Sequence, residues 1–186
     1  MIGHDIAFSL WFFIPAGIAN STPIVAAHVP GLRSLNAPLD FGKKLRKRRI
    51  FGEHKTWRGV ICGTIMATLV VWLQTVYFHH DAWIRHISAP VSYAHLSVLW
   101  LGLLLGFGAL AGDAIESFLK RQWNIPAGQR WFPFDQLDYV IGGLLAATIY
   151  VRLPLQDYGW IIVIWFAMHV LFSYIGYLLK LKDRPL

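Results

Sequence analysis

Five apolar stretches, separated by polar or charged links, set the pattern of this chain. They run roughly over Ile6–Val29, Gly59–Phe78, His95–Leu119, Leu137–Leu153 and Trp160–Leu181. A membrane-spanning helix needs about 20 mainly apolar residues. The fourth stretch is short, but Asp135 and Gln136 can form its interfacial start. The pattern predicts an all-α integral membrane protein with about five transmembrane helices in a single domain over residues 1–186.

Composition agrees with a membrane protein. The chain is 56% hydrophobic and only 15% charged, and its formal net charge is +7. Most of the basic residues lie in one link, which indicates an anionic partner near a membrane face, either lipid headgroups or nucleotide phosphates. We expect no nucleic-acid partner, and the oligomeric state is left open. Cys62 is the single cysteine, so an intrachain disulfide is excluded and no Cys-based metal site is expected.

Lysine and arginine, which favour cytoplasmic links, predict the orientation. The link over residues 30–58 carries nine of them, whereas the next link carries only Arg85. Basic residues return after the third stretch and near the C-terminus, where Lys182 and Arg184 lie. We therefore expect a multi-pass protein of the cell membrane, with its N-terminus outside and its C-terminus in the cytoplasm.

This orientation places three carboxylates in one layer. Asp113 lies 18 residues after His95, or about 27 Å along a helix, close to the full hydrocarbon thickness. Asp113 should therefore lie near the cytoplasmic boundary. Asp135 and Asp138 begin the fourth stretch on the same side, and the basic link of residues 30–58 opens onto this face.

Asp113 is the first candidate site residue, because intramembrane carboxylates are costly and usually functional. On a helix it shares a face with Ser117, and Lys120 and Arg121 continue this face. The alternative is an interfacial carboxylate paired locally with one of these two cations. Gly102, Gly106, Gly108 and Gly112 precede it at GxxxG spacing, which predicts close helix packing.

Asp135 and Asp138, spaced i, i+3, put two carboxylates on the first turn of a helix. Together with Asp113 they offer the oxygen ligands that Mg²⁺ takes alongside substrate phosphates. The alternative is that Asp135 is an N-cap and Asp138 its capping-box partner.

The basic link and the first stretch supply further candidates. The run from Lys43 to Arg49 is most simply a positive loop attracted to anionic lipids. Lys55 and Arg58 lie nearer the second stretch and are better placed to reach a phosphate. Polar residues and Pro23 interrupt the first stretch around Asn20 and Ser21, which favours either a polar cavity or a tolerated kink.

Several blocks also resemble a known family. Ser117–Arg121 followed by Phe134–Asp138 resembles the signature of the CDP-diglyceride synthase superfamily, and the closer resemblance is to its CDP-archaeol synthase branch. The shared blocks are Asn20–Pro23, Pro38–Lys44, Arg48–Gly59 and Pro133–Gly143. Glu116 departs from that pattern, in which the position beside the serine is often basic.

The resemblance implies transfer of CMP from CTP to a lipid phosphate, of archaeal ether type or phosphatidic acid, giving a CDP-lipid and pyrophosphate in phospholipid biosynthesis. It implies Mg²⁺ on Asp113, Asp135 and Asp138, which with Lys120 form the catalytic set. The expected substrate-binding residues are Asn20, Ser21, Lys43, Lys55, Arg58, Ser117 and Arg121.

Two other classes of function are open at this stage. A small transporter or ion-relay protein would use Asp113 in a path across the membrane, but the three carboxylates gather at one face. A lipid-binding scaffold would account for the basic run and gives no reason for Asp113.

Overall fold

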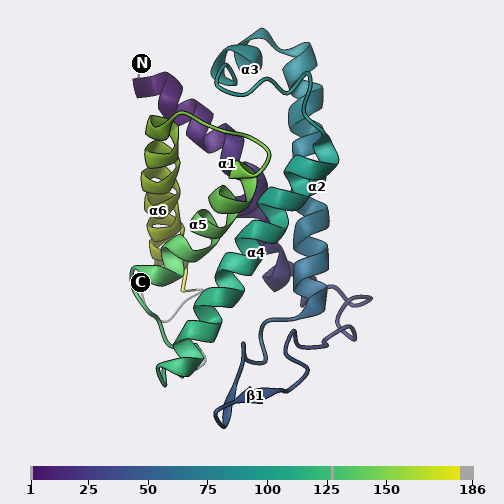
Figure 1. The fold of residues 1–186 in the computed structure, drawn as a ribbon, viewed down its shortest axis with the longest axis vertical. Helices are drawn as coiled ribbons and strands as arrows, with labels where there is room; N and C mark the ends of the chain where they lie inside the picture. The colour runs from purple at the N-terminus through teal and green to yellow at the C-terminus, as the bar shows by residue number, and fades with distance from the viewer. Residues whose placement is uncertain (1, 127, 181–186) are drawn as a thin grey trace.

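The computed structural model describes residues 2–126 and 128–180, and this part of the chain is mainly helical (Figure 1). Its elements are α1 (Ile2–Ala26), β1 (Lys44–Leu45), β2 (Arg48–Arg49), α2 (Trp57–His80), α3 (Ala82–Ile87), α4 (Val98–Gln122), α5 (Phe134–Thr148) and α6 (Leu155–Leu178). A helix covers most of each of the five predicted stretches within the described residues, so the predicted all-α class is confirmed.

Four helices, α1, α2, α4 and α6, are long and apolar enough to cross a membrane. The fourth predicted stretch forms α5, which has 15 residues. It is therefore about 22 Å long and shorter than a hydrocarbon core of about 30 Å. The expected end of the last stretch, Leu181, and the basic residues Lys182 and Arg184 lie outside the described residues.

Helix α1 is continuous through the part of the sequence that predicted an interruption. Pro15 and Pro23 both lie inside it. The hydroxyl groups of Ser21 and Thr22 donate to the carbonyl oxygens of Gly17, at 3.1 Å, and Ile18, at 2.7 Å. Polar side chains here bond back to their own helix, which lets them lie at membrane depth.

Helix α4 packs closely against its neighbours through its glycines. A methyl group on Gly106 would lie 2.7 Å from the Cβ of Ala67 in α2. On the other side, a methyl group on Gly112 would overlap the carbonyl oxygen of Asp138 in α5. The predicted close packing is confirmed, and it fixes the start of α5 against the C-terminal half of α4.

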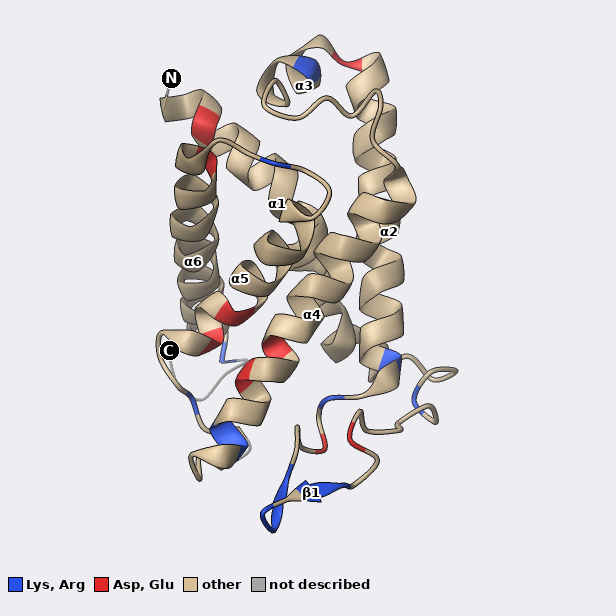
Figure 2. Ribbon diagram, in the orientation of Figure 1, with Lys and Arg blue, Asp and Glu red and all other residues tan. Residues whose placement is uncertain are grey.

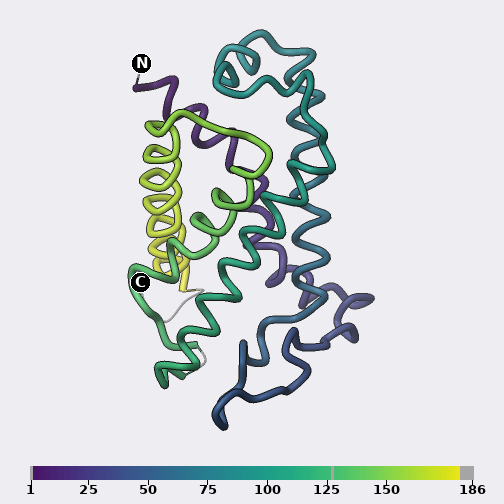
Figure 3. The backbone as a smooth tube through the Cα atoms, in the orientation of Figure 1, coloured from purple at the N-terminus to yellow at the C-terminus, as the bar shows by residue number. Residues whose placement is uncertain are grey.

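The two ends of the helix bundle differ in character (Figure 1). The start of α1 and the short helix α3 lie at one end, and the basic link lies at the other (Figure 3). Arg85 donates to the carbonyl oxygens of Phe78 and His79 at the end of α2, whereas the Arg33 carbonyl accepts from Arg58 at its start. The links predicted to face opposite sides therefore lie at opposite ends of α2.

A buried carboxylate organises the basic link. Asp40 accepts hydrogen bonds from the Arg49 guanidinium, at 2.7 and 3.2 Å, and from the backbone N–H groups of Gly42, Phe51 and Gly52. Burial opposes ionisation of Asp40, but these donors outweigh it and hold its pKa well below the ordinary value of 3.8. The β1–β2 hairpin is thus tied to the loop that precedes it.

Asp40→Ala should loosen this hairpin, because hydrogen bonds to a charged group stabilise by about 1.5–3 kcal/mol. We expect trypsin to cut between residues 43 and 49 at least about tenfold faster, since cleavage tracks the open population. Because the folded pKa is depressed, the stabilisation is present above the ordinary pKa and is lost as pH falls through the folded value. The measurement at pH 7 therefore captures all of it.

Glu53→Gln is the matched control, because Glu53 is 83% exposed and lies 3.7 Å from Arg49. It should leave the cleavage rate unchanged. Equal cleavage of the Asp40→Ala protein and the unsubstituted protein would show that Asp40 does not hold the hairpin.

Candidate active site

Charged residues of opposite sign face each other at the end of the bundle that carries the basic link (Figure 2). Acidic positions lie on the lower halves of α4 and α5, and basic positions lie on the hairpin and at the end of α4. The close α4–α5 contact at Gly112 brings Asp138 beside Asp113. The predicted gathering of carboxylates and cations at one face is confirmed.

Asp113, Glu116 and Asp138 form a compact carboxylate cluster. Each offers an oxygen, and these oxygens lie within 4.8 Å of one another. Asp113 and Glu116 are three residues apart on α4, so they share a helix face. Asp138 reaches the same point from α5, and its carboxylate accepts a hydrogen bond of 2.5 Å from the backbone N–H of Tyr139.

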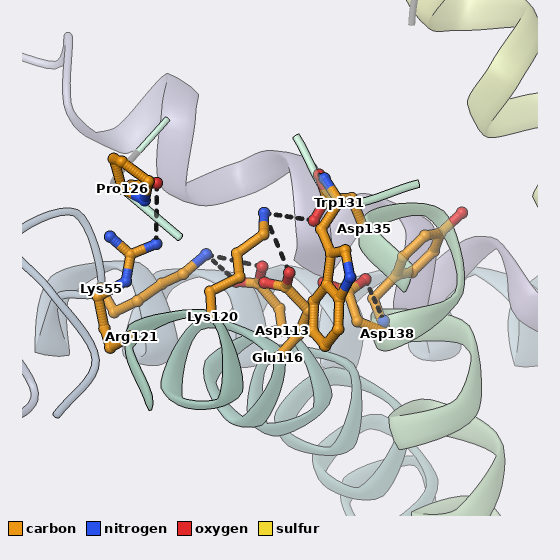
Figure 4. Close-up of polar contacts among 10 residues, drawn as sticks. Lys55, Asp113, Glu116, Lys120, Arg121, Pro126, Trp131, Asp135 and Asp138 are labelled. Atoms are coloured by element: carbon orange, nitrogen blue, oxygen red, sulfur yellow. Dashed lines mark hydrogen bonds and ion pairs between the residues drawn. The ribbon is translucent and has the colours of Figure 1, made fainter. Parts of the chain in front are cut away.

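Two lysines neutralise part of this negative charge (Figure 4). The Lys55 Nζ atom lies 2.7 and 2.6 Å from the two carboxylate oxygens of Asp113. The Lys120 Nζ atom lies 3.0 Å from Glu116 and also forms an ion pair with Asp135. Asp135 accepts a second hydrogen bond, of 2.8 Å, from the backbone N–H of Trp131.

Two cavities meet at these side chains. The large chamber, of about 720 Å³, extends between α1, α2, α4, α5 and α6 and is partly lined by Pro23, Ile24, Ala27, Val60 and Leu110. The small chamber, of about 280 Å³, lies against the end of α4 and is lined by Ser117, Lys120, Arg121 and residues 128–130. Lys55, Asp113, Asp135 and Asp138 line both chambers. The large chamber thus has an apolar part, whereas most of the residues that line the small one are polar or charged.

Comparison of the sequence with known protein families identifies the family of this chain. The model of a family described as CarS-like CDP-archaeol synthase matches residues 3–186. The chain belongs to the CDP-archaeol synthase family. A CDP-archaeol synthase from Pyrococcus abyssi is 34% identical and covers 98% of this chain and 99% of its own length. Another, from Methanopyrus kandleri, is 37% identical and covers 97% of this chain and 94% of its own.

A solved structure shares the fold of this CDP-archaeol synthase family member. It is described as an intramembrane enzyme for archaeal membrane lipid biosynthesis, with a TM-score of 0.67 and 24% identity. The match covers 87% of this chain and 90% of that one. The family membership and the four long apolar helices make the chain a multi-pass membrane transferase of lipid biosynthesis, of the cytidylyltransferase type, and the transporter alternative is set aside.

Most predicted site residues of this CDP-archaeol synthase family member line one of the two chambers. Asn20 and Arg58 line the large chamber, and Ser117, Lys120 and Arg121 line the small one. Ser21 and Lys43 line neither. Ser21 bonds to its own helix, and Lys43 is exposed in the basic link.

Two of the predicted phosphate-binding arginines have backbone partners. Arg58 is buried and donates to the carbonyl oxygens of Leu32, at 3.1 Å, and Arg33, at 3.3 Å. Arg121 donates to the Pro126 carbonyl oxygen at 3.2 Å (Figure 4). Both side chains hold neighbouring loops in addition to lining a chamber.

Glu116 is the residue that sequence reasoning missed. The family pattern marks it only as a departure from a position that is often basic. In the structure Glu116 pairs with Lys120 and also completes the carboxylate cluster. Its spacing of three residues from Asp113 was the signal in the sequence. His54 and His169 also line the large chamber.

The chemistry of the cluster fits a divalent metal ion. Its donors are three carboxylate oxygens, the hard ligands that Mg²⁺ prefers. Asp135 is not one of the three residues whose oxygens lie this close together, and it is held beside the cluster by Lys120 and the Trp131 N–H. Four carboxylates against two paired lysines leave a net negative charge at this point, which a divalent cation would balance.

Proposed function

We propose that this protein transfers the CMP group of CTP to the phosphate of a membrane lipid, giving a CDP-lipid and pyrophosphate. The lipid is an archaeal-type ether lipid phosphate, with phosphatidic acid as the ester alternative. The observation that carries the proposal is the position of the carboxylate cluster, at the junction of a chamber with an apolar part and a polar chamber. This arrangement suits a reaction between a lipid and a nucleotide.

In the proposed reaction, an oxygen of the lipid phosphate forms a bond to the α-phosphorus of CTP. The bond between the α-phosphorus and the oxygen bridging to the β-phosphorus breaks, and the electron pair leaves with pyrophosphate. The lipid phosphate is already ionised near neutral pH, so the step needs no strong general base. Catalysis then consists mainly of alignment and charge stabilisation.

The position of each residue indicates whether it would bind the metal ion or the nucleotide. Asp113, Glu116 and Asp138 would hold Mg²⁺, with Asp135 as the further carboxylate expected from the sequence. When bound there, the cation supplies neutralisation of the charge that develops on the phosphates. Lys120 keeps Asp135 and Glu116 in position and donates toward the triphosphate in the small chamber. Ser117 and Arg121 line that chamber and would complete the nucleotide site.

The lipid phosphate would lie in the large chamber, with its chains in the bilayer. Asn20 from α1 and Arg58 from α2 line this chamber and would bind the lipid phosphate. Lys55 can reach either substrate, since it lines both chambers. Ser21 and Lys43 would contribute at the margins, on the helix turn and the basic link next to the large chamber.

CTP is a cytoplasmic nucleotide, so we place the site on the cytoplasmic face of the cell membrane. Cysteines introduced at Arg33 and Arg85, in a Cys62→Ser background, should react with a membrane-impermeant thiol reagent from opposite sides. Arg33→Cys should react from the cytoplasm. Reaction of both from one side would contradict this orientation.

The activity is tested by reconstituting the purified protein with CTP, Mg²⁺ and a panel of ether and ester lipid phosphates. We expect CDP-lipid and pyrophosphate in equal amounts with at least one lipid, and loss of both products on addition of EDTA. A failure to form product from every lipid phosphate would refute the proposed function.

A further inference from the structure

The ion pair between Lys55 and Asp113 lies at the junction of the two chambers. Lys55 precedes Thr56, whose side chain caps α2 by accepting from the Gly59 N–H. The backbone around Lys55 is therefore anchored at a helix start. Its side chain extends to Asp113 on α4, and its Nζ atom contacts both carboxylate oxygens.

This ion pair uses the same oxygens that a divalent cation in the carboxylate cluster would need. A cation bound to Asp113 would lie within a few ångströms of the Lys55 ammonium group. Two positive groups so close repel strongly where water is partly excluded, and both side chains are only about a quarter exposed. The ammonium group of Lys55 and a divalent cation therefore compete for Asp113.

Lys120 is in a different position. It bridges Glu116 and Asp135, and Asp135 is outside the cluster. Lys120 can keep its bond to Asp135 when a cation binds Glu116. Lys55 has Asp113 as its one ion-pair partner among residues 2–126 and 128–180, so a cation at Asp113 leaves it without a counter-ion.

Nucleotide phosphates would supply the missing counter-ion. Lys55 lines both chambers, and its long side chain can turn from Asp113 toward a phosphate in either one. Resting on the proposed function, we propose that Lys55 is an exchangeable counter-ion. It holds Asp113 until CTP and the divalent cation bind together, and it then transfers to the phosphates.

The test is the affinity for Mn²⁺ alone of the full-length protein in detergent. The concentration of free Mn²⁺ is measured from its electron paramagnetic resonance signal. Lys55→Gln should bind Mn²⁺ about tenfold or more tightly than the unsubstituted protein, since a like charge has been removed. Its affinity for CTP at saturating Mn²⁺ should fall by about tenfold, since a charged donor to phosphate is lost. Lys55→Met, which keeps most of the side-chain length, repeats the test if the glutamine variant does not fold.

Two further variants separate exchange from a structural role. Lys55→Arg keeps the charge and should bind Mn²⁺ as weakly as the unsubstituted protein. Lys44→Gln removes an exposed cation from the same link and should not change Mn²⁺ affinity. Mn²⁺ affinity that is unchanged or lower in both Lys55→Gln and Lys55→Met would overturn the proposal. That result would leave the proposed function intact if the unsubstituted protein still forms CDP-lipid.

Discussion

Replacing Asp138 by asparagine should lower the rate of CDP-lipid formation by about a hundredfold or more, as expected for the loss of a major electrostatic stabiliser. The substitution keeps the size of the side chain and removes one charge from the carboxylate cluster. Asp138 is the member that α5 contributes, so the substitution leaves only the two carboxylates of α4 in the cluster. The rate is measured with purified protein at saturating CTP and Mg²⁺.

Asp157→Asn is the matched control for this experiment. Asp157 is a buried carboxylate at the start of α6, at the opposite end of the bundle. Its substitution should leave the rate within about twofold of the original, as for a site away from the reacting groups. An Asp138→Asn protein that reacts at the original rate would refute the assignment of Asp138 as a metal ligand.

Gly112→Ala should damage both stability and activity, although Gly112 contacts no substrate. The added methyl group would overlap the Asp138 carbonyl oxygen and push α5 away from α4. Overpacking of this kind costs about 1–3 kcal/mol. A displacement of Asp138 by about 1 Å can lower the rate by about a hundredfold. Thermal unfolding in detergent and the CDP-lipid assay measure the two effects.

Gly159→Ala provides the comparison, because a methyl group at Gly159 in α6 would meet no atom within 4 Å. It should leave the rate unchanged and should not lower the thermal stability, because alanine favours a helix more than glycine does. Full activity and unchanged thermal stability of Gly112→Ala would show that the close contact between α4 and α5 is not required for the site.

The helices could be predicted from the sequence because long apolar runs in a membrane have few alternatives to a helix. The length of α5 could not, because Ile149 to Leu153 are as apolar as the helix before them. That segment leaves the helix and leads into α6, where the Tyr158 hydroxyl accepts from the Leu153 N–H at 3.3 Å. The Tyr150 hydroxyl accepts from the Ser97 N–H at 2.8 Å, a tertiary partner that no local pattern identifies.

The site could be predicted as a layer of charge but not as a set of pairs. Depth along each helix placed Asp113 and Asp138 together. The pairing of Lys55 with Asp113 depends on how the basic link folds back. Two residues of the basic run have structural partners: Arg48 donates to the Gln122 carbonyl oxygen, and Arg49 donates to Asp40. Periodicity within one segment cannot predict contacts of this kind.

On the proposed function, the two chambers would give the two substrates separate approaches to one site. Lys55, Asp113, Asp135 and Asp138 line both chambers, so a nucleotide in the small chamber and a lipid phosphate in the large one would meet at these side chains. Pyrophosphate would leave through the small chamber and the CDP-lipid through the large one. A single stationary site could then serve an aqueous phase and a membrane without a moving carrier.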